Sequence, residues 1–335
     1  MRSFVIIGFL SVIFSGCYRN PEIISNEKEI FFIPEGYPLP VYDLSTNYSE
    51  TQFQLGKKLF FDPILSENMT VSCSSCHLPQ AAFSDPGNAF SKGINNSISK
   101  RNSPALINLA WQTNFMWDGG VNHIEIQPLA PLTNPDEMGS NLAPVIAHLN
   151  QNSAYKILFK KAFDTDSITS AYMFKALAHY LSCLISSESK YDRYIRGEIN
   201  FTSSEINGLN VFQQNCSTCH KPPLFTDLSY RNNGIGWNAS SPDAGRFIVT
   251  QVNSDSLKFK VPTLRNIAVT FPYMHDGRIK SLEEVINHYA SGNFHMNVDT
   301  SINSVALSPS EKLDLLNFLK TLTDEEFITN PKLKL

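Results

Sequence analysis

The sequence has no cluster of basic residues, no long apolar stretch and few segments in which polar and apolar residues alternate. Its 27 Lys and Arg residues are outnumbered by 31 Asp and Glu residues, and the formal net charge is −4. Nucleic-acid binding needs a clustered basic face, so nucleic acid is not an expected partner. The scarcity of alternating runs argues against large sheets. We therefore expect an all-α, mostly helical fold with long loops.

An apolar run from Phe4 to Phe14 follows Arg2 and is too short to span a bilayer. This pattern is typical of an export signal, and it predicts a signal over residues 1–17 and a periplasmic protein. The small residues just before Cys17 also match a bacterial lipobox, which predicts a lipid anchor that holds the chain at the membrane surface. A cleaved soluble signal with an incidental cysteine is the alternative.

The remaining chain is long enough for two modest domains. Residues 18–45 form a polar lead, and the interpretation of the rest is an N-terminal domain over 46–190 and a C-terminal domain over 191–330. Apolar residues recur at three- and four-residue steps through 173–184, which predicts a helix between the two regions. Cys183 lies within this pattern and is expected to be a small core residue.

Four of the six cysteines belong to two complete C-x-x-C-H motifs, which makes a disulfide framework a poor interpretation. In this pattern the two thiols add to the vinyl groups of a c-type haem, and the histidine becomes an iron ligand. Half a zinc site would need thiolates paired across the motifs, and a redox pair has no need of the histidine. The predicted attachment residues are Cys73, Cys76 and His77 for haem 1, and Cys216, Cys219 and His220 for haem 2.

The second axial ligand of each iron separates an enzyme from an electron carrier. No histidine lies between His77 and His123, and Met116 is the chief methionine candidate there, so we expect an open position on haem 1. For haem 2 the candidates are Met274, His275, His288 and Tyr289. Tyr289 shares one apolar helix face with Leu282, Val285 and Ile286, which points its side chain inward; a plain core tyrosine is the alternative.

Several further passages carry a resemblance to a known family. In chain order they are Phe61-Asp62-Pro63, Arg101–Pro104, Trp117-Asp118-Gly119, Asn134–Gly139, Val261–Asn266 and Pro272–Gly277. Together with the two haem motifs, they resemble the bacterial di-haem cytochrome c peroxidase/MauG family over residues 53–322. The resemblance implies two cytochrome-c-like domains with one haem each. Haem 1 would be the peroxidatic centre, and haem 2 would receive or store electrons.

The resemblance also implies roles for single residues. Trp117 would be the electron bridge between the haems, its alternative being a core tryptophan. Gln127 and Glu137 match the distal peroxide-binding residues of the family, and Pro131 matches a proline of the distal wall; a plain surface Gln and Glu are the alternative. Asn102, with the carbonyl oxygens of Thr270 and Pro272, matches a calcium site between the haems, and an all-oxygen ligand set suits that ion.

Two departures from the usual peroxidase pattern resemble the MauG branch. The distal histidine that typical members carry on haem 1 is absent, and Tyr289 stands where the family's methionine ligand to haem 2 would be. Met274 is the second choice for that ligand.

The resulting prediction is a peroxidase that reduces hydrogen peroxide to water with electrons from a small cytochrome c or copper protein. One alternative is a MauG-like oxidase that modifies tryptophan or tyrosine in a partner protein. The other is a di-haem electron carrier.

Overall fold

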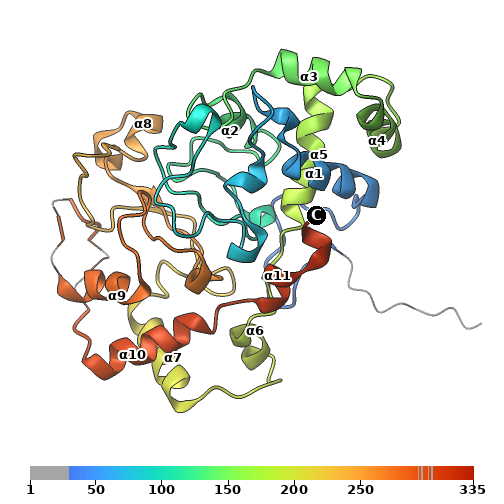
Figure 1. The fold of residues 1–335 in the computed structure, drawn as a ribbon. Coiled ribbons are helices and arrows are strands. Elements are labelled where there is room, and N and C mark those ends of the chain that lie inside the picture. The colour runs from blue at the N-terminus through green and yellow to red at the C-terminus, as the bar shows by residue number, and fades with distance from the viewer. Residues whose placement is uncertain (1–29, 293, 296, 301, 303–304) are drawn as a thin grey trace, which may run out of the picture. The chain divides into compact units, whose positions relative to one another are not determined.

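The computed structural model describes residues 30–292, 294–295, 297–300, 302 and 305–335. The predicted export signal, Cys17 and the first part of the polar lead lie outside the described residues. The described chain is mostly helical with long connections, as the sequence predicts (Figure 1). No helix in this part of the chain has both the length and the apolar character needed to cross a bilayer.

The α-helices, in chain order, are α1 (Glu50–Phe61), α2 (Leu129–Thr133), α3 (Leu142–Gln151), α4 (Ser153–Phe163), α5 (Ser170–Ser182), α6 (Lys190–Ile195), α7 (Ser203–Asn215), α8 (Phe247–Thr250), α9 (Leu282–Ser291), α10 (Pro309–Lys320) and α11 (Glu325–Thr329). The 3-10 helices are η1 (Pro63–Leu65), η2 (Cys73–Ser75), η3 (Pro79–Ala81), η4 (Ile94–Asn96), η5 (Leu109–Trp111), η6 (Asn253–Asp255), η7 (Ile267–Val269) and η8 (Pro331–Leu333). Two short strands, β1 (Tyr230–Arg231) and β2 (Phe259–Lys260), pair antiparallel, with Tyr230 opposite Lys260.

The capping-box sequences Ser281–Glu284 and Ser308–Glu311 predict two helix starts, and both form. Ser281 caps α9 with Glu284, and Ser308 caps α10 with Glu311; in each box the side chains and backbone amides bond reciprocally. The helix predicted over 173–184 is α5, which ends at Ser182. Leu184 is therefore buried beyond the helix end and not within it.

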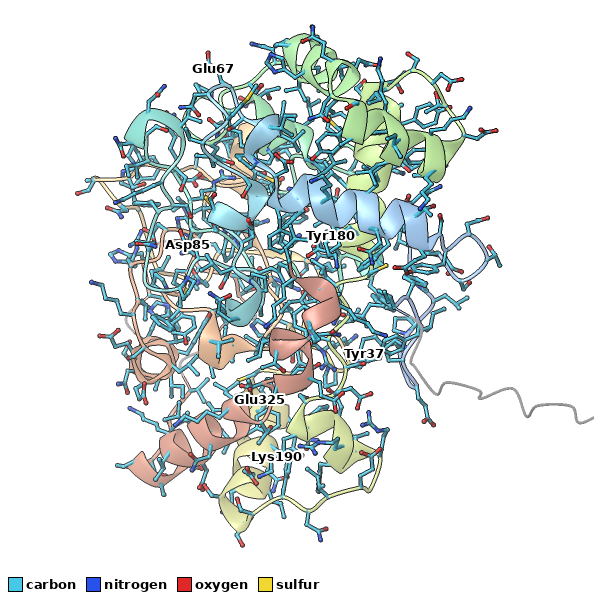
Figure 2. The ribbon with its side chains drawn as sticks, turned by 45° about the vertical axis from the view of Figure 1, so that its right-hand side comes forward. Tyr37, Glu67, Asp85, Tyr180, Lys190 and Glu325 are labelled. Carbon is cyan, nitrogen blue, oxygen red and sulfur yellow. The ribbon has the colours of Figure 1, made fainter. Side chains whose placement is uncertain are left out.

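The first helix pair is formed by α1 and α5, which pack closely. A Cβ at Gly56 of α1 would overlap the carbonyl oxygen of Ala176, so glycine permits this approach. Phe53 and Phe60 contact the ring of Tyr180, whose hydroxyl donates to the carbonyl oxygen of Leu333 at 2.6 Å (Figure 2). The first C-x-x-C-H motif follows α1 in the chain.

The second helix pair is α7 and α10, which lie side by side in Figure 1. Here too a glycine permits the close approach of the two helices, because a Cβ at Gly208 of α7 would overlap the carbonyl oxygen of Asp314. The buried core here includes Phe212, Phe225 and Phe318. The second C-x-x-C-H motif begins directly after α7, whereas η1 lies between α1 and the first motif. Each motif thus follows, in the chain, a helix that is packed through a glycine.

A buried polar network joins the segment after α5 to the C-terminal part. Ser186 Oγ donates to Asp324 Oδ2 at 2.8 Å and accepts from Asn266 Nδ2 at 3.0 Å, while the Ser186 amide donates to Asn108 Oδ1 at 2.9 Å. Tyr37 adds a bond from its hydroxyl to the Ser186 carbonyl oxygen at 3.0 Å (Figure 2). Residues 31–335 form one unit.

Arg265 lies beside this network and is 1% exposed. Its two terminal nitrogens donate to the two carboxylate oxygens of Asp192 at 2.8 and 2.7 Å, and its Nε donates to the carbonyl oxygen of Pro223 at 2.8 Å. The pair ties α6 to the segment 261–266, which forms part of the site described next.

Candidate functional site

One cavity of about 910 Å³ is lined by both C-x-x-C-H motifs. Its walls come mainly from residues 60–138 and 212–319. The volume lies at the upper end of the range of about 300–1,000 Å³ that is usual for ligand pockets. Apart from the candidate ligand His288, every residue predicted from the sequence to have a catalytic, haem-binding or calcium-binding role lines this cavity.

The first motif forms a tight turn at η2. The amides of Cys76 and His77 both donate to the carbonyl oxygen of Cys73, at 3.2 and 3.0 Å. His77 Nδ1 donates to the carbonyl oxygen of Phe83 at 2.7 Å. Because Nδ1 carries the proton of this bond, Nε2 is the nitrogen available to a metal. Burial lowers the pKa of His77, which favours the neutral ring that metal coordination requires.

The second motif begins where α7 ends. The amide of Cys216 donates to the carbonyl oxygen of Phe212 at 2.8 Å, and the amide of His220 donates to the carbonyl oxygen of Cys216 at 3.0 Å. His220 Nδ1 lies 3.2 Å from the carbonyl oxygen of Phe225 and 3.1 Å from that of Pro262. Burial lowers the pKa of His220 as well. The two motifs thus present the same donor set, two thiols and an imidazole Nε2, to one cavity.

These residues fit covalently attached haem. The five described cysteines are free thiols. Within the described residues, no three His, Cys, Asp or Glu side chains gather as they would around a bare metal ion, so the motifs are not two halves of one zinc site. A cavity of this size, with a C-x-x-C-H turn at each of two places in its wall, suits two tethered macrocycles.

Glu137 and Gln127 reach the cavity from segments on either side of α2. Asn134 Nδ2 donates to Glu137 Oε1 at 2.8 Å. Burial raises the pKa of Glu137, and the bond from Asn134 opposes that rise. Gln127 Nε2 lies 3.9 Å from Met116 Sδ. The arrangement places a carboxyl group that can exchange a proton, and an amide that can donate a hydrogen bond, on the wall of one pocket.

Trp117 also lines the shared cavity. Its indole Nε1 donates to the carbonyl oxygen of Asn102 at 2.8 Å, and its own carbonyl oxygen accepts the Lys260 amide at 2.7 Å. The Arg101–Pro104 passage therefore holds the indole ring, and β2 holds the backbone of Trp117.

The candidates for the second axial position near the second motif are separated by the structure. Met274 and Tyr289 line the cavity, whereas His288 is not among its lining residues and its Nε2 bonds to the carbonyl oxygen of Asn233 at 3.0 Å. Asn233 Nδ2 lies 3.1 Å from Met274 Sδ, and its side chain also bonds to the phenol of Tyr289. Burial raises the pKa of Tyr289 to about 12. His275 lines the cavity but stacks on Phe259, with ring centroids 3.7 Å apart.

The predicted calcium ligands lie on the same cavity wall. Asn102 Nδ2 donates to the carbonyl oxygens of Asn88 and Ala89 at 3.1 and 3.2 Å, which leaves Oδ1 as its cation-binding atom. The backbone of Asn102 is held by His275 and by the indole of Trp117. Thr270 and Pro272 complete the predicted set.

Sequence reasoning missed two cavity residues and one ion-pair cluster. Lys260 and Asn233 line the cavity, and neither has a sequence signal except that Lys260 directly precedes the Val261–Asn266 passage. Arg101 pairs with Asp118 at 2.5 Å and with Asp243 at 2.6 Å. Arg101 and Asp118 lie in passages that carried the family resemblance, but Asp243 comes from a loop that no sequence pattern singled out.

Comparison with known proteins gives a consistent result. Residues 50–200 match the family model described as di-haem cytochrome c peroxidase. The chain is 35% identical to the methylamine utilization protein MauG of Methylorubrum extorquens, over 91% of this chain and 87% of that protein. It is 33% identical to cytochrome c551 peroxidase of Nitrosomonas europaea, over 82% and 80%. A crystal structure of a MauG-like protein associated with microbial copper homeostasis superposes with a TM-score of 0.84, at 33% identity, over 90% of this chain and 97% of that one.

Proposed function

Because the chain belongs to the di-haem cytochrome c peroxidase family, whose members include MauG proteins, we propose that it reduces hydrogen peroxide to water with electrons from a small redox protein. A small cytochrome c or a copper protein would be the donor. The observation that carries this proposal is the placement of Glu137 and Gln127 on the wall of the cavity that holds the first C-x-x-C-H motif.

Each half of the chain would hold one haem, in domains over 46–190 and 191–330. Two features support this division: the two helix pairs, α1 with α5 and α7 with α10, and the motif that lies after the first helix of each pair in the chain. Cys73, Cys76 and His77 would hold haem 1, and Cys216, Cys219, His220 and Tyr289 would hold haem 2. When bound, the haems would supply the iron and the electron-transfer chemistry.

The chain's own residues handle the protons. Glu137 takes a proton from one oxygen of hydrogen peroxide and returns it to the departing oxygen, which leaves as water. With two electrons and two further protons, each peroxide gives two molecules of water. Gln127 donates a hydrogen bond from Nε2 as negative charge develops, a role suited to a fixed dipole in a dry pocket. Asn134 keeps the Glu137 carboxylate oriented through its 2.8 Å bond.

Trp117 would carry electrons between the two haem sites. Two observations support this role: Trp117 lines the cavity, and its indole is held by a hydrogen bond to the carbonyl oxygen of Asn102. A calcium ion bound by Asn102 Oδ1 and the carbonyl oxygens of Thr270 and Pro272 would stiffen the same wall. The N-terminal pattern supports export to the periplasm and, through Cys17, a lipid anchor.

A second function is favoured by one specific observation, the phenol of Tyr289 in the cavity beside the second motif. Asn233 bonds both to Met274 Sδ and to the phenol of Tyr289, so this contact does not separate the two candidates. Tyr289 is proposed as the iron ligand because it stands where the family's methionine ligand to haem 2 would be. A tyrosinate stabilises oxidised iron, whereas a methionine raises the haem potential and eases reduction. A long-lived oxidised protein could then act on tryptophan or tyrosine of a partner protein, as a MauG-like oxidase.

Low-temperature EPR of the ferric protein, followed by peroxide addition, tests the proposal. One high-spin and one low-spin haem, with a Soret change on peroxide addition, are expected for an open haem 1. Turnover with a ferrocytochrome c then distinguishes the peroxidase from the protein-modifying oxidase. Two low-spin haems that are inert to peroxide would contradict the open site and leave either an electron carrier or an enzyme that needs reductive activation.

A further inference from the structure

Lys260 is a partly buried cation on the wall of the shared cavity. It is the last residue of β2, and its backbone amide donates to the carbonyl oxygen of Trp117. Its Nζ donates to Gln112 Oε1 at 2.6 Å and to the carbonyl oxygen of Asn114 at 2.7 Å. Both of these acceptors are neutral.

Two arginines whose side chains are mostly or fully buried are paired with carboxylates. Arg265 is paired with Asp192, and Arg101 with Asp118 and Asp243. Lys260 forms no such ion pair among the described residues: Asp118 attracts it only at longer range. Burial lowers the pKa of Lys260 to about 8, against that attraction. Burying an ammonium without a carboxylate is costly, so the chain leaves a positive charge here to be balanced.

The missing negative charge is one that a haem carries. Each haem has two propionate carboxylates, and an ammonium has three donors, of which Lys260 uses two within the protein. We propose that the Lys260 side chain binds a propionate carboxylate of a haem in this cavity, while the backbone amide of Lys260 bonds to Trp117. This inference rests on the proposed haem content of the cavity, and it adds a charge pair that fixes one haem edge beside the tryptophan.

Lys260→Met is the test, with Lys258→Met as the matched control. Lys258 lies two residues earlier, bonds to Asp255 at 3.3 Å and is not among the residues that line the cavity. The holoproteins are made with 13C in the haem propionate carboxyl carbons. Three quantities are compared: covalent haem content, the labelled carboxylate bands in redox difference infrared spectra, and the midpoint potentials of the two haems.

Lys260→Met is expected to keep both haems, to move one labelled carboxylate band and to lower the potential of at least one haem, because a buried positive charge favours the reduced state. Lys258→Met should match the wild type in all three quantities. Labelled bands and potentials unchanged in Lys260→Met would overturn the inference.

If Lys260→Met fails to load haem, Lys260→Arg decides, since it keeps the cation. Wild-type haem content in Lys260→Arg supports the ion pair, and failure there also overturns it. The outcome is separate from that of the proposed function. A protein with a Lys260-dependent carboxylate band but no reaction with peroxide would refute the peroxidase and leave the propionate contact standing.

Discussion

Replacing Asp192 by Asn should destabilise the protein strongly, because it leaves the guanidinium of Arg265 buried without its counter-charge. Arg265 is 1% exposed and Asp192 is 8% exposed. The two side chains share a bidentate pair, and Asp192 also accepts from the amide and the hydroxyl of Ser189 at 2.9 and 2.6 Å. Removing one partner of a buried ion pair costs about 3–5 kcal/mol. That is a large share of the roughly 5–15 kcal/mol that stabilises a typical protein.

The sign of the pH dependence follows from the same contacts. Although burial opposes it, the hydrogen-bonded guanidinium of Arg265 holds the pKa of Asp192 below its usual value. The pair therefore stabilises the fold above the unfolded-state pKa of about 3.9, and this stabilisation is lost as the pH falls through the lower folded-state pKa. At neutral pH the full effect of Asp192→Asn should be measurable.

Urea unfolding of the holoprotein, followed by far-UV circular dichroism, provides the assay, with a shifted midpoint and an unchanged slope expected. The matched control is Glu198→Gln, which breaks the contact between Glu198 and Arg196 at the surface, where the Glu198 side chain is 46% exposed. Exposed pairs contribute about 0–1 kcal/mol. Equal losses from Asp192→Asn and Glu198→Gln would refute the reasoning.

Three further outcomes are expected. Glu137→Gln should slow the peroxide-dependent Soret change in stopped flow by about 10²–10⁴-fold. The control is Asp136→Asn, because the Asp136 carboxylate pairs with Lys100 at 3.1 Å, and it should keep the wild-type rate. Equal rates in the two variants would remove Glu137 from the mechanism. Tyr289→Phe should change the EPR signal of the low-spin haem and Met274→Leu should not, and the reverse result would make Met274 the ligand. Gly56→Ala should cost about 1–3 kcal/mol in urea unfolding because its Cβ overlaps α5, and an unchanged midpoint would show that the helix pair can separate freely.

The helices and the residues around the two motifs were largely predictable from the sequence because their signals are local. The capping boxes at Ser281 and Ser308 fix helix starts with side chains three residues apart, and both formed. The apolar face that ends at Tyr289 was predicted from spacing alone, and it lines the cavity. Periodicity was less informative about where a helix ends. Leu184 continues the apolar pattern beyond α5 because burial, not helical conformation, sets that pattern.

What the sequence could not supply is the balance of charge between distant segments. Nothing in the sequence distinguishes Lys260 from other lysines, because its two neutral acceptors, Gln112 and Asn114, are brought to it only by the fold. Asn233 approaches Met274 only in the folded chain, and Asp243 meets Arg101 across 142 positions. Such contacts join chain segments with no shared periodicity, so no spacing rule predicts them.

The walls of the cavity also bear on how the protein is assembled. Residues 60–138 form one part and residues 212–319 the other, so the space is complete only after the late part of the chain has folded against the early part. If both haems occupy it, covalent attachment at Cys73 and Cys216 is expected to precede closure. A chain synthesised without haem should then stay open and be digested readily by protease. The supply of haem, more than the rate of synthesis, would set how much folded protein accumulates.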